Sequence, residues 1–112
     1  MKIIFIFSIA ILILLSISGC TPATQDSIIG TWEQTHTLGI PLSISNFYRF
    51  DSNGTYREAT SQSGLSSDTP SSYSMSGNLL KFDTGSYDVY LLGTTMYWYK
   101  SNVEQLRFKK IN

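Results

Sequence analysis

The sequence contains one cysteine, one histidine, and equal numbers of basic and acidic residues. One cysteine cannot form an internal disulfide, so packing alone has to hold the folded part together. With His36 as the only histidine, the usual nitrogen and sulfur ligands of a zinc site are missing. Nucleic-acid binding needs a clustered positive face, whereas the adjacent pair Lys109-Lys110 is typical of a solvated strand end. We therefore expect no nucleic-acid partner.

The motifs of common enzymes and ion sites are also missing. A Ser-His-Asp triad would have to use His36, and no G-x-S-x-G elbow accompanies it. Residues 51–54, Asp-Ser-Asn-Gly, begin like a calcium loop but lack the later ligands and the closing glutamate, so they predict a hairpin turn. No phosphate-binding glycine loop precedes a helix. We predict neither an enzyme nor a cofactor or metal site.

The chain begins with an apolar segment. Met1 and Lys2 give a positive start, and residues 3–18 are apolar apart from three serines. As a helix this segment would span about 24 Å, which is short of the roughly 30 Å hydrocarbon core of a bilayer. A positive start, a short apolar stretch and a small-residue exit are typical of a secretory signal. A transmembrane anchor is the alternative.

The exit of this segment, Ile17-Ser18-Gly19-Cys20, resembles the bacterial lipobox. The resemblance implies that residues 1–19 are a lipoprotein signal peptide, and that Cys20 carries a diacylglyceryl group with further acylation. More than one chain gives durable anchoring, so the membrane would be a partner through the N-terminal lipid. The alternative is an unmodified thiol at the end of a helix.

The same resemblance places the protein in the bacterial cell envelope. Gram-negative lipoproteins that stay in the inner membrane usually carry an aspartate after the cysteine. Here the residue is Thr21, which favours the outer membrane in a Gram-negative cell.

The remaining chain, Cys20 to Asn112, has the size of one small domain. All seven tyrosines, both tryptophans and four of the six phenylalanines lie in it, and bulky rings bury much surface per residue. The polar stretch Thr21–Ser27 predicts a flexible tether with a reach of about 15 Å. We therefore divide the chain into a lipidated cysteine with its tether, residues 20–27, and a folded domain, residues 28–112.

The domain alternates short β-favouring runs with turn residues and has no sustained helical period. Asn53-Gly54 is a strong signal for a tight hairpin. The pattern predicts an all-β fold, a small antiparallel up-and-down β-barrel of about eight strands. The predicted strands are residues 28–36, 46–51, 55–60, 71–76, 79–83, 86–92, 95–100 and 104–110.

Two segments of this pattern are unusual. Residues 37–45 carry four aliphatic side chains, so we expect a long connection that folds over an open barrel end rather than lying free in water. In residues 95–100 Met96 and Trp98 alternate with Tyr97 and Tyr99, so both faces look apolar. One of them is either a binding surface or a face covered by a loop.

Gly30-Thr31-Trp32 resembles the G-x-W signature of lipocalins, and the later strand patterns resemble those of short bacterial lipocalin-like lipoproteins. The resemblance implies that Trp32 plugs the closed barrel end beneath a basic residue of the last strand. Lys110, in phase with the apolar positions of that strand, is the preferred partner, and Arg107 is the other choice. A cation over an indole contributes about 0.5–2 kcal/mol.

Two functions remain open. The first is a monomeric, membrane-anchored binding module that takes up a small hydrophobic or amphipathic ligand. Its candidate lining residues, each of which could equally be a core residue, are Tyr48, Phe50, Tyr56, Tyr73, Phe82 and Trp98. The second is a solid barrel whose outer face, at Tyr97 and Tyr99, docks an envelope protein, for example as an inhibitor of a cell-wall hydrolase. The volume of the barrel interior distinguishes the two functions. An open interior pocket of about 300 Å³ or more favours a ligand, whereas a closed interior with an exposed aromatic patch favours a partner protein.

Overall fold

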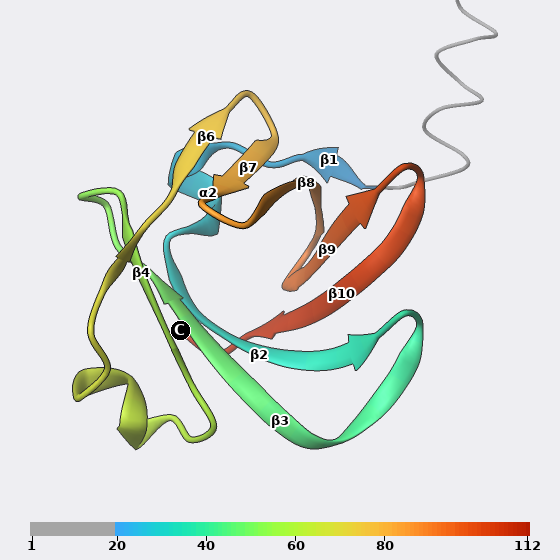
Figure 1. Ribbon diagram of the computed structural model, residues 1–112. Helices are drawn as coiled ribbons and strands as arrows, with labels where there is room; N and C mark the ends of the chain where they lie inside the picture. The colour runs from blue at the N-terminus through green and yellow to red at the C-terminus, as the bar shows by residue number, and fades with distance from the viewer. Residues whose placement is uncertain (1–19) are drawn as a thin grey trace, which may run out of the picture.

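A computed structural model describes residues 20–112, and the predicted signal peptide, residues 1–19, lies outside the described part (Figure 1). No helix among residues 20–112 is both long and apolar enough to cross a membrane. The helical elements are α2 (Gln25–Ile28) and the short 3-10 helix η1 (Ser63–Ser66). The strands are β1 (Thr21–Pro22), β2 (Gly30–Thr37), β3 (Ile40–Phe50), β4 (Thr55–Ala59), β5 (Ser71–Ser72), β6 (Ser74–Ser76), β7 (Leu79–Phe82), β8 (Gly85–Leu92), β9 (Thr95–Lys100) and β10 (Val103–Lys110).

The strands form one antiparallel sheet that curls into a nearly closed barrel. From β6 to β10 each strand pairs with its neighbour in the chain, and β10 then pairs with β2, which continues through β3 and β4 to β5. The remaining seam lies where β5 pairs with β4 and β6 pairs with β7, on either side of Tyr73. The predicted all-β, antiparallel, up-and-down and lipocalin-like barrel is therefore confirmed, and the predicted strand 71–76 is divided at Tyr73 into β5 and β6.

The seam is held by Tyr73 itself. Its backbone N–H donates to the Gly54 carbonyl at 3.0 Å, and its hydroxyl donates to the Asp51 carbonyl at 2.9 Å. Its ring packs edge-on against Phe50, with 5.1 Å between the ring centroids. The interrupted strand thus stays attached to the β3–β4 turn although its sheet hydrogen bonds are few.

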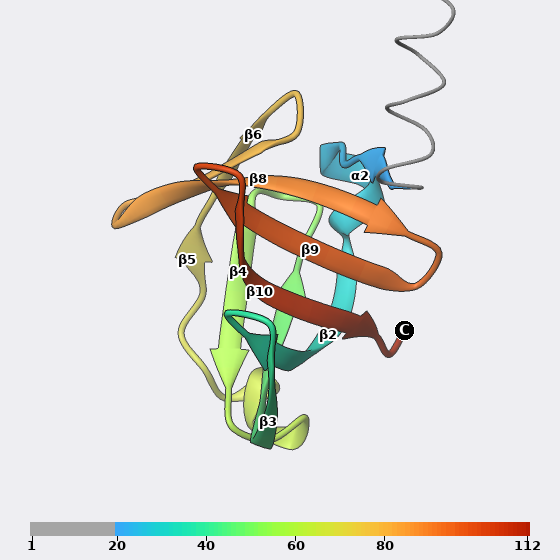
Figure 2. The same cartoon turned by 90° about the vertical axis from the view of Figure 1, so that its right-hand side faces the viewer.

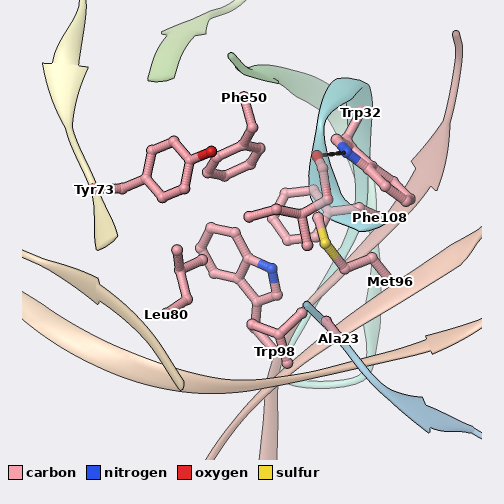
Figure 3. Packing of buried hydrophobic residues seen from close by; sticks show 10 residues of the cluster. Ala23, Trp32, Phe50, Tyr73, Leu80, Met96, Trp98 and Phe108 are labelled. Atoms are coloured by element: carbon pink, nitrogen blue, oxygen red, sulfur yellow. Dashed lines mark hydrogen bonds between the residues drawn. The ribbon is translucent and has the colours of Figure 1, made fainter. Parts of the chain in front are cut away.

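The barrel interior is a core of rings and aliphatic side chains drawn from every side of the barrel (Figure 3). The two indoles are almost fully buried, with 1% of Trp32 and 2% of Trp98 exposed. The other buried members are Ala23, Ile28, Phe50, Tyr73, Leu80, Val89, Met96 and Phe108. Together with the partly buried Tyr87, Leu91 and Leu106, the core residues recur at every second position along β8, β9 and β10, which is the pleat period of a strand with one face inside.

The prediction of a flexible tether over residues 21–27 is wrong. Thr21 and Pro22 form β1 and pair with Leu91 and Tyr90 of β8, and the N–H of Ala23 donates to the Val89 carbonyl at 2.9 Å. Ala23 is buried. The polar residues of this segment have a structural role that composition does not reveal, because Thr24 and Ser27 form the capping box that starts α2.

The prediction of a loop over residues 37–45 that covers the barrel end is also wrong. Leu38 and Gly39 adopt positive φ angles of 51° and 78° and make a tight turn between β2 and β3. Three of the four aliphatic side chains of this hairpin point into solvent, with exposed fractions of 60% for Leu38, 67% for Ile40 and 77% for Ile44, and Leu42 is half-buried. The apolar residues therefore form an exposed hairpin arm rather than a lid.

Candidate functional site

The residues of the predicted barrel plug come together at one end of the barrel. The Trp32 indole N–H donates to the Ile28 carbonyl at 2.9 Å, and the Lys110 ammonium lies 5.5 Å from the centroid of the Trp32 ring. Gly30 has a φ of +133°, and the C-terminal residue Asn112 packs against it. Of the two basic partners that the sequence left open, Lys110 is the one over the tryptophan.

Arg107 is engaged elsewhere. Its guanidinium makes a two-pronged hydrogen bond with the Glu104 carboxylate, with both nitrogen–oxygen distances at 3.0 Å, and lies 5.3 Å from the centroid of the Tyr97 ring. The hydrogen bond from Glu104 raises the pKa of Arg107. Arg107 thus belongs to the outer surface of the barrel.

The six candidate lining residues contact one another inside the barrel. Phe50, Tyr73 and Trp98 are buried, and the other three pack against the same core. The rings interlock: Tyr56 and Phe82 lie 4.8 Å apart between centroids, and Trp98 lies 5.5 Å from Phe82. This packing favours the core interpretation that the sequence left open for Tyr48, Phe50, Tyr56, Tyr73, Phe82 and Trp98.

Two polar groups inside the barrel stand out. Burial, and then the Glu58 carboxylate, raise the pKa of Tyr48, so its phenol stays neutral at any ordinary pH. The Trp98 indole N–H is buried and has no hydrogen-bond partner among residues 20–112. Unpaired buried donors cost about 1–3 kcal/mol, so Trp98 contributes less stability than its size suggests.

A groove of about 360 Å³ lies on the outside of the barrel, over β8 and β9. Figure 2 shows these two strands side by side. Its lining residues are Cys20, Asp88, Tyr90, Leu92, Tyr97, Tyr99 and Asn102. The register across the two strands pairs Asp88 with Tyr99 and Tyr90 with Tyr97, which brings these side chains together on one face. Val89, Met96 and Trp98 occupy the alternate positions and are buried.

This register resolves the ambiguous strand of the sequence. Met96 and Trp98 face the core, and Tyr97 and Tyr99 face the groove. The sequence therefore identified one wall of the groove. It missed Asp88, Tyr90, Leu92 and Asn102, although the alternation of Tyr90 with buried Val89 is a signal that could have found the second wall.

The tyrosines of the groove pack against one another. Tyr90 and Tyr99 meet edge to face with 5.8 Å between centroids, and Tyr97 lies 6.4 Å from Tyr99. Burial, and then the Glu104 carboxylate, raise the pKa of Tyr99, so it remains a neutral hydrogen-bond donor. The groove thus combines apolar ring faces with phenol, carboxylate and amide groups.

Cys20 lies at this groove and is half-buried. Burial raises the pKa of its thiol, which keeps an unmodified Cys20 protonated. Cys20, which the lipobox resemblance marks for lipidation, therefore lies next to the groove and is not separated from the barrel by a flexible linker.

No family model, curated protein or solved structure matches this chain. Within residues 20–112, no three histidine, cysteine or acidic side chains gather closely enough to hold a metal ion.

Proposed function

We propose that this protein is a lipid-anchored protein of the bacterial cell envelope, which binds a small hydrophobic or amphipathic ligand in the groove over β8 and β9. The observation that carries the proposal is the groove itself, whose volume of about 360 Å³ falls within the usual range of ligand pockets. Three tyrosines and Leu92 offer apolar surface to such a ligand. The phenol hydroxyls, Asp88 and Asn102 would orient its polar end.

The barrel interior is a poorer place for the ligand. Trp98 alone contacts five rings, those of Tyr48, Phe50, Phe82, Tyr87 and Phe108, with centroid separations of 4.6 to 6.2 Å. Close-packed interiors resist added volume, and overpacking costs about 1–3 kcal/mol. A guest inside would have to open this network, whereas the groove needs no such rearrangement.

The anchoring part of the proposal is supported by the lipobox resemblance of residues 17–20. The absence of an aspartate after Cys20 favours the outer membrane in a cell that has one. Acyl chains on Cys20 would hold the groove close to a bilayer, where hydrophobic and amphipathic molecules are concentrated.

A second candidate function is a solid barrel that docks an envelope protein. Two observations favour it. The barrel interior is filled by packed rings, and Tyr97 clusters on the outer surface with Arg107 and Glu104, of which tyrosine and arginine are enriched among residues that dominate protein interfaces. The cluster adjoins the groove, so both functions would use the same face of the barrel.

Two measurements test the proposal. Cys20→Ser should abolish membrane association in fractionated cells, and a Cys20→Ser protein that still pellets with membranes at its full mass would refute the anchor. Native mass spectrometry of the lipidated protein from its own host should then reveal a bound small molecule.

The ligand should be lost from Tyr97→Ala and Tyr99→Ala and retained in Phe47→Ala, an aromatic residue on the outer face of β3. A different result would be a wild-type protein that shows no bound small molecule in the mass spectrum and captures a protein whose binding depends on the same two tyrosines. That result would refute ligand binding and support the protein-docking function.

A further inference from the structure

Several exposed aliphatic side chains belong to turns on the side of the barrel where β1 begins. Among residues 20–112, the exposed large hydrophobic residues are Leu38, Ile40, Ile44, Leu92 and Val103. Figure 2 views the barrel from the side that carries the β9–β10 and β2–β3 turns. In Figure 1 both turns lie on the right, where β1 also begins, and Figure 2 shows that they lie across this face from β1.

The groove and one hydrogen bond connect the segments that carry these side chains. Cys20, Leu92 and Asn102 line the same groove, and Val103 follows Asn102 in the chain. The N–H of Leu38 donates to the carbonyl of Gln105 at 2.9 Å, which ties the β2–β3 turn to β10 beside Val103. We call the set Leu38, Ile40, Leu92 and Val103 the aliphatic rim.

Charge is sparse on the β2–β3 part of this rim, whereas the exposed Lys100 pairs with Val103 across β9 and β10. Residues 37–47, which include the whole β2–β3 turn and the exposed arm of β3, contain no charged side chain. Glu104, the residue after Val103, is neutralised by its ion pair with Arg107 at 3.0 Å. A surface of this kind can enter the interface of a bilayer without leaving a charge stranded in apolar surroundings.

The position of Cys20 identifies what covers the rim. Because Thr21 and Pro22 are paired with β8 and Ala23 is buried, no free linker separates Cys20 from the barrel. Acyl chains attached at Cys20 would bring the neighbouring surface of the barrel to the membrane, whereas a seven-residue coil would leave the domain free to turn.

We infer that the aliphatic rim rests on the lipid bilayer, so that the lipidated protein has one fixed orientation with its groove opening at the membrane surface. This inference rests on the lipidation at Cys20 that the proposed function includes. It adds a membrane contact made by the protein chain itself, and it implies that the ligand of the groove enters from the lipid phase.

The test uses the full-length lipidated protein in vesicles of phosphatidylcholine and phosphatidylglycerol that contain doxyl-labelled lipid. The variant Leu38→Cys carries an environment-sensitive fluorophore at the rim. The control Ser63→Cys carries it on η1, an exposed site on the far side of the barrel from β1 (Figures 1 and 2). We expect doxyl lipid to quench the Leu38 label at least threefold more than the Ser63 label, and circular dichroism checks that both variants fold.

Mass spectrometry of the same samples distinguishes a failure of the proposed lipidation from a failure of the proposed membrane contact. A protein without lipid on Cys20 overturns both the proposed anchoring and this inference. A lipidated protein whose Leu38 label is quenched no more than its Ser63 label overturns the inference alone. In a third variant, Leu38→Cys with Val103→Glu, the quenching should fall by at least half, and unchanged quenching would mean that the rim does not carry the contact.

Discussion

Gly30 gives the sharpest test of how the barrel end is built. Its φ of +133° lies in a region that side chains rarely adopt, and a Cβ at this position would lie 2.6 Å from the Asn112 carbonyl oxygen and 3.2 Å from Lys110 Cε. The Asn112 oxygen cannot move away freely because it accepts the Thr31 N–H at 2.9 Å. The variant Gly30→Ala therefore meets backbone strain and a steric clash together.

The two effects can be given magnitudes. A residue forced into a sparse backbone region costs about 1–3 kcal/mol, and overpacking costs about 1–3 kcal/mol more. Domains of this size have total stabilities of about 5–14 kcal/mol. Since each kcal/mol lowers the melting temperature of such a domain by about 4–8 °C, we expect Gly30→Ala to lower it by roughly 10 °C or more.

Gly77 supplies the matched control. It also has a positive φ, +60°, but a Cβ there would meet nothing within 4 Å. The variant Gly77→Ala should cost only about 1–2 kcal/mol, the usual penalty of the left-handed region. Thermal unfolding followed by circular dichroism compares the two variants, and melting temperatures within about 2 °C of each other would refute the steric argument.

Three further predictions concern the core. Trp32→Phe should destabilise the domain more than Trp98→Phe by about 1–2 kcal/mol in urea unfolding, because Trp32 donates a hydrogen bond and the Trp98 N–H has no partner; the reverse order would contradict this. Lys110→Met should cost about 0.5–1 kcal/mol through the lost cation–π contact, and Lys110→Arg should restore most of it. Burial and the Glu58 carboxylate raise the pKa of Tyr48, so the folded phenol keeps its proton after the unfolded one ionises. Stability should therefore fall as the pH rises above about 10, and Tyr48→Phe should flatten this fall in urea midpoints.

The fold was predictable from the sequence because its determinants are local. Alternation of Tyr48, Phe50 and their neighbours sets which face of a strand is buried, and turns such as Asn53-Gly54 join each strand to the next. The closing contact of β10 with β2 follows once eight strands are placed in sequence order. The Lys110–Trp32 contact follows from the phase of the last strand.

The segments that the sequence mispredicted depend on contacts between distant residues. Nothing in residues 21–27 indicates that Ala23 fits against Val89 or that Thr21 pairs with Leu91, 70 positions away. The β2–β3 arm was mispredicted for a related reason: exposed aliphatic residues normally indicate a covered segment, and here the chain leaves them uncovered. The groove was missed in part because Cys20, β8, β9 and Asn102 meet only in the folded protein.

The two errors of prediction have a common physical consequence. A tether that pairs with β8 removes the slack between Cys20 and the barrel, and an uncovered aliphatic arm on the same side gives the barrel a surface suited to lipid. Either feature alone would leave the orientation undetermined. A fixed cysteine beside an acidic surface would be repelled from a bilayer with anionic lipids. An aliphatic arm far from the anchor would have no reason to meet the bilayer. If Cys20 is lipidated as proposed, the two features together would make one contact geometry favourable and would put the tyrosines of the groove at the boundary between lipid and water, where rings with one polar end are most stable.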